Sequence, residues 1–370
     1  MPTLTHKAQL DVLVIGGGQA GLAIGYHLAQ RRLCFLIVDA GPAVGHVWRN
    51  RWDSLRLFTP AEYDALPGTP FPAPTGSHPT KDEVADYLNS YAKRHGLPVR
   101  LNTAVQRLHR HGGGFTAVTT TGTVHARQVV VATGPFQHPH TPSFANTLTP
   151  GILQLHSAQY RTPAQLPRGA RVLVVGAANS GLQIADELAA THRVTVAVGS
   201  RPAQLPQRLL GRDLFFWLDR TGLMTKPATS RLARRIRSRG DLVIGTRISA
   251  LRRRGVTFRP RLTTFTDHTA HFGDGTSTPV DAVVWATGYR SDYRWLHIPG
   301  VIADGQVQHD AGTTNVPGLY FLGLPWQTSR GSGLLGFVAR DAASLADRLT
   351  GVDDVRDARE AEPRSMAGAS

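Results

Sequence analysis

A glycine-rich pattern that occurs twice constrains the fold of this chain more than any other feature. The first copy is Gly16-Gly17-Gly18-Gln19-Ala20-Gly21, and the second is Gly176-Ala177-Ala178-Asn179-Ser180-Gly181. Each copy follows an apolar run and precedes a helical pattern, which is the context of a dinucleotide-binding fingerprint. One copy alone would be weak evidence, because 38 of the 370 residues are glycine. Two copies in the same context predict two bound nucleotides.

The first fingerprint belongs to a predicted strand-helix-strand unit. An apolar run at residues 11–15 indicates the first strand, and residues 20–31 carry apolar side chains at helical spacing. A second apolar run at 33–38 ends on Asp39, whose carboxylate is placed to accept hydrogen bonds from an adenosine ribose. A pyrophosphate is expected at the start of the helix, where free N–H groups and the helix dipole favour an anion.

The second fingerprint predicts a different ribose site. The strand predicted at residues 194–198 is followed by Gly199-Ser200-Arg201, with no acid where Asp39 stands in the first unit. Arg201 can neutralise a 2′-phosphate and Ser200 can hydrogen-bond to it, which favours NADPH over NADH. The alternative interpretation is an ordinary surface arginine in a polar loop.

Two Ala-Thr-Gly turns, at residues 132–134 and 286–288, each end an apolar strand and predict paired crossings between domains. The predicted fold class is α/β, with two Rossmann-like dinucleotide-binding domains and the NADPH domain inserted into the FAD domain. We expect the FAD domain at 1–145 and 287–352, the NADPH domain at 146–286, and a disordered tail at 353–370. The length supports two domains, because one core rarely serves so long a chain.

Composition excludes several classes of protein. No run is long and apolar enough to span a bilayer and no secretory signal begins the chain, so we expect a cytoplasmic enzyme without stable membrane insertion. The net charge of +15 lacks a nucleic-acid motif beside it, and we expect no nucleic-acid partner. Cys34 is the only cysteine, expected as a small buried strand residue, and it cannot form a redox pair. No set of Cys or carboxylate ligands completes a metal site.

These motifs resemble the class B flavin-containing monooxygenases, which use FAD and NADPH, and especially their bacterial and plant YUCCA-type members. Further marks of the resemblance are Gly45-His46-Val47-Trp48, Leu55-Arg56-Leu57, His78-Pro79-Thr80-Lys81 and Gly333-Leu334-Leu335-Gly336. The resemblance implies that NADPH reduces FAD and that oxygen then forms a C4a-(hydro)peroxyflavin. It further implies oxygenation of a small organic substrate, which is indole-type, contains N or S, or is a 2-oxo acid. The alternatives are an NADPH oxidoreductase that passes electrons to another acceptor, and a nucleotide sensor without turnover.

The chain departs from the family pattern at two places. The linker signature keeps His156 and Tyr160, but Pro150 and Ile152 replace its Phe and Gly. The active-site Asn of animal-type members has no counterpart between residues 51 and 88. Tyr160 in place of Trp argues against a typical Baeyer–Villiger enzyme, and the missing Asn favours the YUCCA-like members.

The candidate site residues fall into three groups. The expected FAD contacts are Gly16, Gly18, Gln19, Ala20, Gly21, Asp39, Trp48, Val105, Ala132, Gly134 and Gln327. The expected NADPH contacts are Gly176, Ala178, Asn179, Ser180, Gly181, Ser200, Arg201, Ala286, Thr287 and Gly288. His156 and Tyr160 are linker candidates for positioning the hinge, and no residue is assigned to catalysis. The sequence leaves open the substrate, the type of oxygenation, the degree of preference for NADPH, and a homodimer against a monomer.

Overall fold

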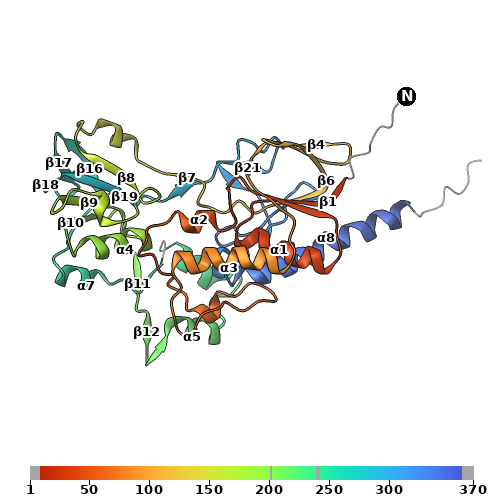
Figure 1. The fold of residues 1–370 in the computed structure, drawn as a ribbon, viewed down its shortest axis with the longest axis horizontal. Helices are drawn as coiled ribbons and strands as arrows, with labels where there is room; N and C mark the ends of the chain where they lie inside the picture. Colours follow the sequence, from red (N-terminus) through yellow and green to blue (C-terminus); the bar gives the residue numbers. More distant parts are fainter. Residues whose placement is uncertain (1–8, 201, 239–241, 361–370) are drawn as a thin grey trace, which may run out of the picture.

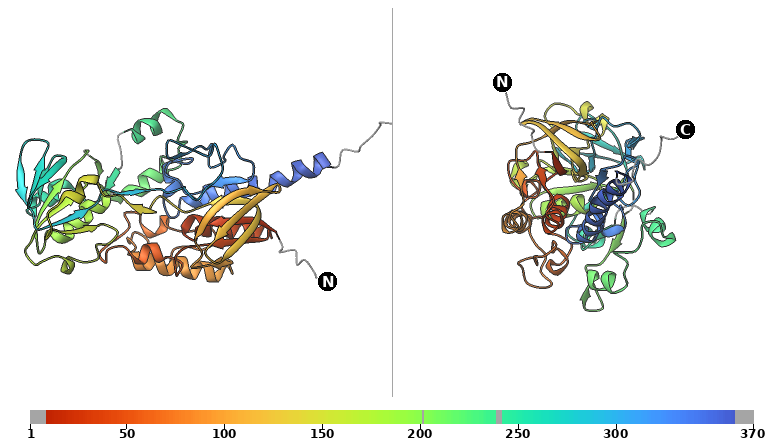
Figure 2. Two further views of the ribbon diagram at one scale, coloured as in Figure 1. Left: turned by 90° about the horizontal axis from the view of Figure 1, so that it is seen from above. Right: turned by 90° about the vertical axis from the view of Figure 1, so that its right-hand side faces the viewer.

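The computed structural model describes residues 9–200, 202–238 and 242–360. It contains two main sheets, one mixed and one parallel, that lie toward opposite ends of an elongated molecule (Figures 1 and 2). Arg201, one of the predicted NADPH contacts, lies outside the described residues. No helix of the described part is both long enough and apolar enough to cross a membrane.

The larger sheet has the strand order β3-β2-β1-β6-β5-β4, and β23 pairs with β6 from far along the chain. Its strands are β1 (Leu10–Ile15), β2 (Phe35–Val38), β3 (Val99–Arg100), β4 (Val105–His111), β5 (Gly114–Thr119), β6 (Gly122–Val131) and β23 (Leu319–Phe321). Helices α1 (Gln19–Gln30), α3 (Lys81–Arg94) and α8 (Val338–Glu360) share a buried apolar core with one face of this sheet. The late strand and closing helix therefore pack with the first fingerprint.

The start of α3 shows how local sequence sets an element boundary. The hydroxyl of Thr80 accepts a hydrogen bond from the backbone N–H of Glu83, and the Glu83 carboxylate accepts one from the Thr80 N–H at 2.7 Å. This reciprocal capping box satisfies two N–H groups that the helix leaves unpaired. Apolar side chains at helical spacing along this segment, among them Val84, Leu88 and Tyr91, are buried and hold the helix on the core.

The smaller sheet is parallel throughout and has the order β15-β10-β9-β19-β8. These strands are β8 (Leu153–His156), β9 (Arg171–Val175), β10 (Arg193–Ala197), β15 (Thr257–Arg259) and β19 (Ala282–Trp285). Helices α4 (Asn179–Leu188) and α7 (Ile248–Arg253) share a core with one face. The opposite face packs on an antiparallel sheet of β16 (Leu262–Thr266), β17 (Thr269–Phe272) and β18 (Ser277–Pro279).

Short elements join the two sheets. Strand β7 (His138–Pro139) follows the first Ala-Thr-Gly turn and pairs antiparallel with β20 (Tyr289–Arg290), which follows the second. Helix α2 (His46–Arg49) carries Trp48, whose side chain packs against the cores of both sheets. The two turns thus lead into segments that lie side by side, while the domain boundaries themselves stay a prediction.

The remaining elements lie outside the two main sheets. They are α5 (Leu214–Arg220), α6 (Arg231–Arg237), and the strand pairs β11 (Ala203–Leu205) with β14 (Leu242–Ile244), β12 (Arg208–Leu209) with β13 (Arg212–Asp213), and β21 (Ile302–Ala303) with β22 (Gln306–Val307). The last of these pairs, β21 with β22, packs on the larger sheet. Four short 3-10 helices complete the set: Ala61–Tyr63, Ser143–Thr147, Pro163–Gln165 and Arg330–Gly333.

Two expectations differ from the structure. Cys34 is exposed, because β2 begins one residue later and the backbone of Cys34 is held at the surface by hydrogen bonds with Asp11. The closing helix α8 continues to Glu360, and so extends into the segment expected to be a disordered tail. Residues 361–370 of that segment lie outside the described part.

Candidate functional site

The first fingerprint is a turn that only glycine can form at two of its positions. Gly16 has a φ of +112°, and a Cβ atom there would lie 2.5 Å from the carbonyl oxygen of Ala132. A Cβ on Gly21 would lie 1.9 Å from the carbonyl oxygen of Gly16. By contrast, the space around Gly18 is open within 4 Å. The turn therefore packs tightly against β6 and leaves the Gly18 side clear for a pyrophosphate.

Asp39 stands at the end of β2 beside this turn, as the sequence predicts. One carboxylate oxygen accepts a hydrogen bond from the Gly17 N–H at 2.6 Å, and the other accepts from the Gly41 N–H at 2.7 Å. These two bonds fix the orientation of the carboxylate. Each oxygen keeps a further lone pair that can accept a ribose hydroxyl.

The second fingerprint repeats the construction of the first. Gly176 has a φ of +115°, and its hypothetical Cβ would lie 2.3 Å from the carbonyl oxygen of Ala286. A Cβ on Gly181 would lie 2.0 Å from the carbonyl oxygen of Gly176. Ala286 contacts Gly176 in the same way that Ala132 contacts Gly16. The alanine of each Ala-Thr-Gly turn therefore packs against one fingerprint.

The hydrogen bonds of the two turns show which residues correspond. The Gly16 N–H donates to the carbonyl oxygen of Val38, and the Gly176 N–H donates to that of Ala197. The next residue along each strand is therefore Asp39 in the first unit and Val198 in the second. An apolar side chain thus stands in the second unit where the first unit has the carboxylate of Asp39. Ser200, a predicted NADPH contact, is exposed two residues further on.

Both helices that follow the fingerprints begin without a side-chain cap and without an acid in the first turn. Their first N–H groups therefore face no competing carboxylate of their own, which suits a phosphate. Ala20 lies in the buried part of α1, while Ala178 is the residue that caps α4. These helix N-termini, together with the turns in which a Cβ would clash at the glycines, fit two dinucleotides.

Two polar side chains of the fingerprints already have protein partners. The Asn179 amide donates to the carbonyl oxygen of Leu242 at 3.1 Å and accepts from the Ile244 N–H at 3.3 Å, which ties the start of α4 to β14. The Gln19 amide donates to the carbonyl oxygen of Gly333 at 3.1 Å. Ser180, in the same turn as Asn179, is partly exposed.

Three other predicted FAD residues have distinct surroundings. Gln327 is buried, and its amide accepts from the Leu324 N–H at 3.2 Å and donates to the Ala311 carbonyl oxygen at 3.4 Å. Its second N–H and the second lone pair of its oxygen are left for a flavin. Val105 begins β4 and packs on the core of the larger sheet, and Gly134 has the left-handed φ of +67° that its turn requires.

His156 has a partner for each ring nitrogen. Nε2 lies 3.0 Å from the carbonyl oxygen of Gly288, and Nδ1 accepts a hydrogen bond from the Ala158 N–H at 3.0 Å. Because a carbonyl can only accept, these partners select the neutral ring with its proton on Nε2. Burial lowers the pKa of His156 in agreement with that form. The hydroxyl of Thr287 donates to the His140 carbonyl oxygen nearby.

Tyr160, the other linker candidate, is a core residue. Its ring is completely buried within the smaller sheet's core, and its hydroxyl donates to the Glu187 carboxylate at 2.8 Å. Burial is the main cause of its raised pKa. Tyr160 therefore anchors the linker on α4, which is a structural task.

Sequence reasoning missed a cation that packs against a pair of aromatic rings at the crossing. The guanidinium carbon of Arg51 lies 5.0 Å from the ring centres of both Phe136 and Tyr289, and a guanidinium nitrogen donates to the Tyr289 hydroxyl. The ring of His156 packs edge-on against Tyr289 at 5.1 Å. Tyr289 directly follows the Ala-Thr-Gly turn at residues 286–288. This position was the one feature of the sequence that could have indicated the cluster.

Sequence reasoning also missed a buried acid. Asp64 is fully buried, and burial raises its pKa to about 7. One of its oxygens accepts a 2.6 Å hydrogen bond from the Thr59 hydroxyl, while the other has no partner among the described residues. Nothing in the sequence separates this aspartate from the surface acids around it.

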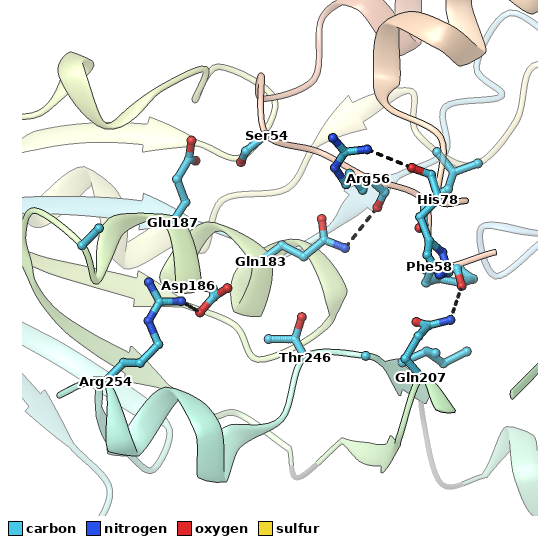
Figure 3. A pocket seen from close by; sticks show the side chains of 14 residues that line it. Ser54, Arg56, Phe58, His78, Gln183, Asp186, Glu187, Gln207, Thr246 and Arg254 are labelled. Carbon is cyan, nitrogen blue, oxygen red and sulfur yellow. Dashed lines mark hydrogen bonds and ion pairs between the residues drawn. The ribbon is translucent and has the colours of Figure 1, made fainter. Parts of the chain in front are cut away.

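A cavity of about 500 Å³ lies between the segment 54–58, the side of α4 and the end of β14 (Figure 3). Its polar lining pairs largely with itself, as in the ion pair of Arg254 with Asp186 and the hydrogen bond from the Gln207 amide to the Phe58 carbonyl oxygen. The Phe58 ring stacks on Phe215 at 6.0 Å. The cavity lies along the side of α4, away from the fingerprint at its start.

Comparisons with known proteins agree with this geometry. Residues 13–209 match the family described as pyridine nucleotide-disulphide oxidoreductase. An uncharacterized CzcO-like oxidoreductase of Geobacillus kaustophilus is 44% identical over 92% of this chain and 98% of its own length. A flavin-containing monooxygenase from Stenotrophomonas maltophilia is 32% identical with a TM-score of 0.80, over 93% of this chain and 99% of that one. The indole-3-pyruvate monooxygenase YUCCA8 of Oryza sativa is 27% identical over 91% of this chain and 90% of its own.

Proposed function

Because this chain belongs to the pyridine nucleotide-disulphide oxidoreductase family and, within it, to the flavin-containing monooxygenases, we propose that it is a single-component enzyme that uses FAD and NADPH to oxygenate a small organic substrate. The observation that carries the proposal is the inequality of the two nucleotide sites. Asp39 offers a fixed carboxylate at the first, whereas Val198 leaves the second without one. A carboxylate suits the ribose of FAD, and its absence suits a phosphorylated ribose.

The residues that would hold FAD are those of the first fingerprint, with Asp39 at the ribose and the Gly18 side of the turn at the pyrophosphate. The second fingerprint would hold NADPH in the same way, with Ser200 near its ribose. When bound, the flavin accepts a hydride from NADPH and supplies the chemistry that activates oxygen. The protein's own task is to bind, orient and exclude water.

The crossing segments support this arrangement. Gly288 follows Ala286 and Thr287, the turn that packs against the second fingerprint. The neutral ring of His156 donates a hydrogen bond to the Gly288 carbonyl oxygen. Arg51, which packs against the rings of Phe136 and Tyr289, holds its segment against the two crossings. A rigid crossing keeps the two nucleotide sites in register, which is how a protein contributes to transfer between bound cofactors.

An apolar, flat substrate is favoured by a cluster of four aromatic rings. Phe58 stacks on Phe215, Tyr63 stacks on Phe337 at 6.3 Å, and Phe215 touches both pairs. No hydrogen bond is recorded for the Tyr63 hydroxyl within the described residues. Of the proposed substrate classes (indole-type, N- or S-containing, or 2-oxo acid), the rings favour the indole type, as does the name of the rice relative.

The test begins with the purified protein and its absorbance spectrum, which should show bound FAD. NADPH should then be oxidised with consumption of oxygen, and a substrate screen by mass spectrometry should detect a product that has gained one oxygen atom or lost a carboxyl group. Oxygen-independent transfer of electrons to a quinone or protein acceptor, with no oxygenated product, would instead support the alternative oxidoreductase.

The proposal includes a cytoplasmic location, because the chain's single cysteine leaves no disulfide framework of the kind common in oxidising compartments. Its partners are a small substrate and molecular oxygen. A homodimer is not required by the site, since the described residues that fit both nucleotides come from one chain.

A further inference from the structure

Two arginines lie beside the turn that follows β10, and neither belongs to a fingerprint. Strands β10 and β15 are parallel neighbours with Ala197 opposite Arg259. The segments that follow the two strands therefore leave the sheet at the same edge. The Val198 N–H donates to the Arg259 carbonyl oxygen at 2.9 Å. Further on, a guanidinium nitrogen of Arg261 donates to the carbonyl oxygen of Gly199 at 3.3 Å.

The charges of these two arginines are not neutralised by an ion pair within the described residues. Nε of Arg259 is buried and has no hydrogen-bond partner there. Arg261 is exposed, and its recorded partner is a neutral carbonyl. A buried guanidinium N–H without an acceptor is costly, which points to an anion that completes the site.

An acid that interacts electrostatically with Arg259 is Asp274, in the turn before β18. Its carboxylate is hydrogen-bonded by the hydroxyl and N–H of Thr276, and these bonds are the main cause of its lowered pKa. The charge of Arg259 contributes least to that shift. Asp274 therefore lies within the electrostatic reach of Arg259 without pairing with it.

We propose that Arg259 and Arg261 bind the 2′-phosphate of NADPH and set the preference of the second site for NADPH over NADH. Guanidinium groups match the oxygens of a phosphate with two parallel N–H donors, and they stay charged at any working pH. Ser200, two residues after Val198 in the turn that follows β10, adds a hydroxyl donor. The inference rests on the proposed function, because it assigns a specificity site to the NADPH that the function requires.

The test is a binding titration of the FAD-loaded protein with NADP⁺, NAD⁺ and 2′,5′-ADP, followed by calorimetry. The variants are Arg259→Gln and Arg261→Gln, with Arg253→Gln as the control, since Arg253 is an exposed arginine at the end of α7 and loses the same charge. Each test variant should weaken NADP⁺ and 2′,5′-ADP by about tenfold to a hundredfold and leave NAD⁺ within about twofold. The control should retain the wild-type values.

The inference is overturned if the wild-type protein prefers NADP⁺ and both variants show the same preference, measured as the ratio of NADP⁺ affinity to NAD⁺ affinity. Failure of the proposed function looks different, because wild type itself would then bind neither NADP⁺ nor 2′,5′-ADP. Arg261 is exposed, so Arg261→Gln should fold even if the partly buried Arg259 does not tolerate glutamine. In that event Arg261→Gln carries the test, and Arg259→Lys, which keeps the charge but loses the fork of donors, should weaken 2′,5′-ADP binding relative to wild type.

Discussion

The Nε2 of His156 lies 3.0 Å from the carbonyl oxygen of Gly288, and the N–H of His140 donates to the same oxygen at 2.9 Å. Three segments meet at this atom: the end of β8, the first crossing and the second crossing. The neutral imidazole is the form that satisfies both of its partners. His156 is thus placed as a positioning residue of the junction between the two sheets.

This placement predicts a pH dependence of stability. The folded protein lowers the pKa of His156, so below about pH 6.5 the unfolded chain takes up a proton that the folded imidazole resists. The free energy of unfolding should therefore decrease as the pH falls below 6.5. His156→Gln should reduce the difference in the free energy of unfolding between pH 8 and pH 5, measured by urea unfolding. An unchanged difference would contradict the assignment, and His111→Gln at an exposed position serves as the control.

The buried carboxyl of Asp64 predicts a dependence of the opposite sign. Its pKa is raised to about 7, so between about pH 4 and pH 7 the folded protein keeps a proton that the unfolded chain has lost. The free energy of unfolding should decrease as the pH rises through this range. Asp64→Asn, which can still accept from Thr59, should stabilise the protein at pH 8 by about 2 kcal/mol. Asp86→Asn, at an exposed ion pair, should bring no such gain in the same denaturation series.

The two fingerprints predict separable defects. A methyl group on Gly21 would clash with the Gly16 carbonyl oxygen, and one on Gly181 would clash with that of Gly176. Gly21→Ala should therefore yield protein with little bound FAD, whereas Gly181→Ala should keep FAD and lose NADPH binding. Flavin absorbance per mole of protein and NADP⁺ titration measure the two effects. Gly351→Ala, in open space on α8, is the matched control, and loss of FAD in Gly181→Ala would argue against independent sites.

The correspondence of Val198 with Asp39 predicts a change of nucleotide preference. In Val198→Asp a carboxylate would stand at the ribose of the second site, where it repels a phosphate and accepts ribose hydroxyls. NADP⁺ affinity should fall by about tenfold or more, and NAD⁺ affinity should rise. The isosteric control is Val198→Asn, which lacks the charge. Equal effects of the two substitutions on NADP⁺ would show that volume rather than charge decides.

Features that depend on neighbours along the chain were predictable. The strands and helices around both fingerprints, helix α3 with its capping box, and the position of Asp39 follow from apolar periodicity, glycine turns and local hydrogen bonds. The resemblance to the flavin-containing monooxygenases was predictable for the same reason. Its motifs are short and contiguous, and the comparisons confirm it.

Features that depend on contacts between distant segments of the chain were not predictable from the sequence. Strand spacing showed that no acid follows β10, but only the hydrogen bonds of Gly16 and Gly176 identify Val198 as the counterpart of Asp39. Nor does a sequence show that the amides of Asn179 and Gln327 are already engaged by backbone groups. Such partners are set by packing, and packing brings together residues that the sequence separates.

The sequence by itself determined that this chain holds two dinucleotide-binding units and that they are unequal, because each unit is a continuous stretch whose turn requires glycine. The tertiary structure alone decided what surrounds them. It placed Arg259 and Arg261 beside the turn after β10, and it joined the crossings at Gly288 through His156. The physical reason is that charge and hydrogen-bond complementarity act over a few ångströms in space, and parallel strands bring their ends together whatever the length of chain between them.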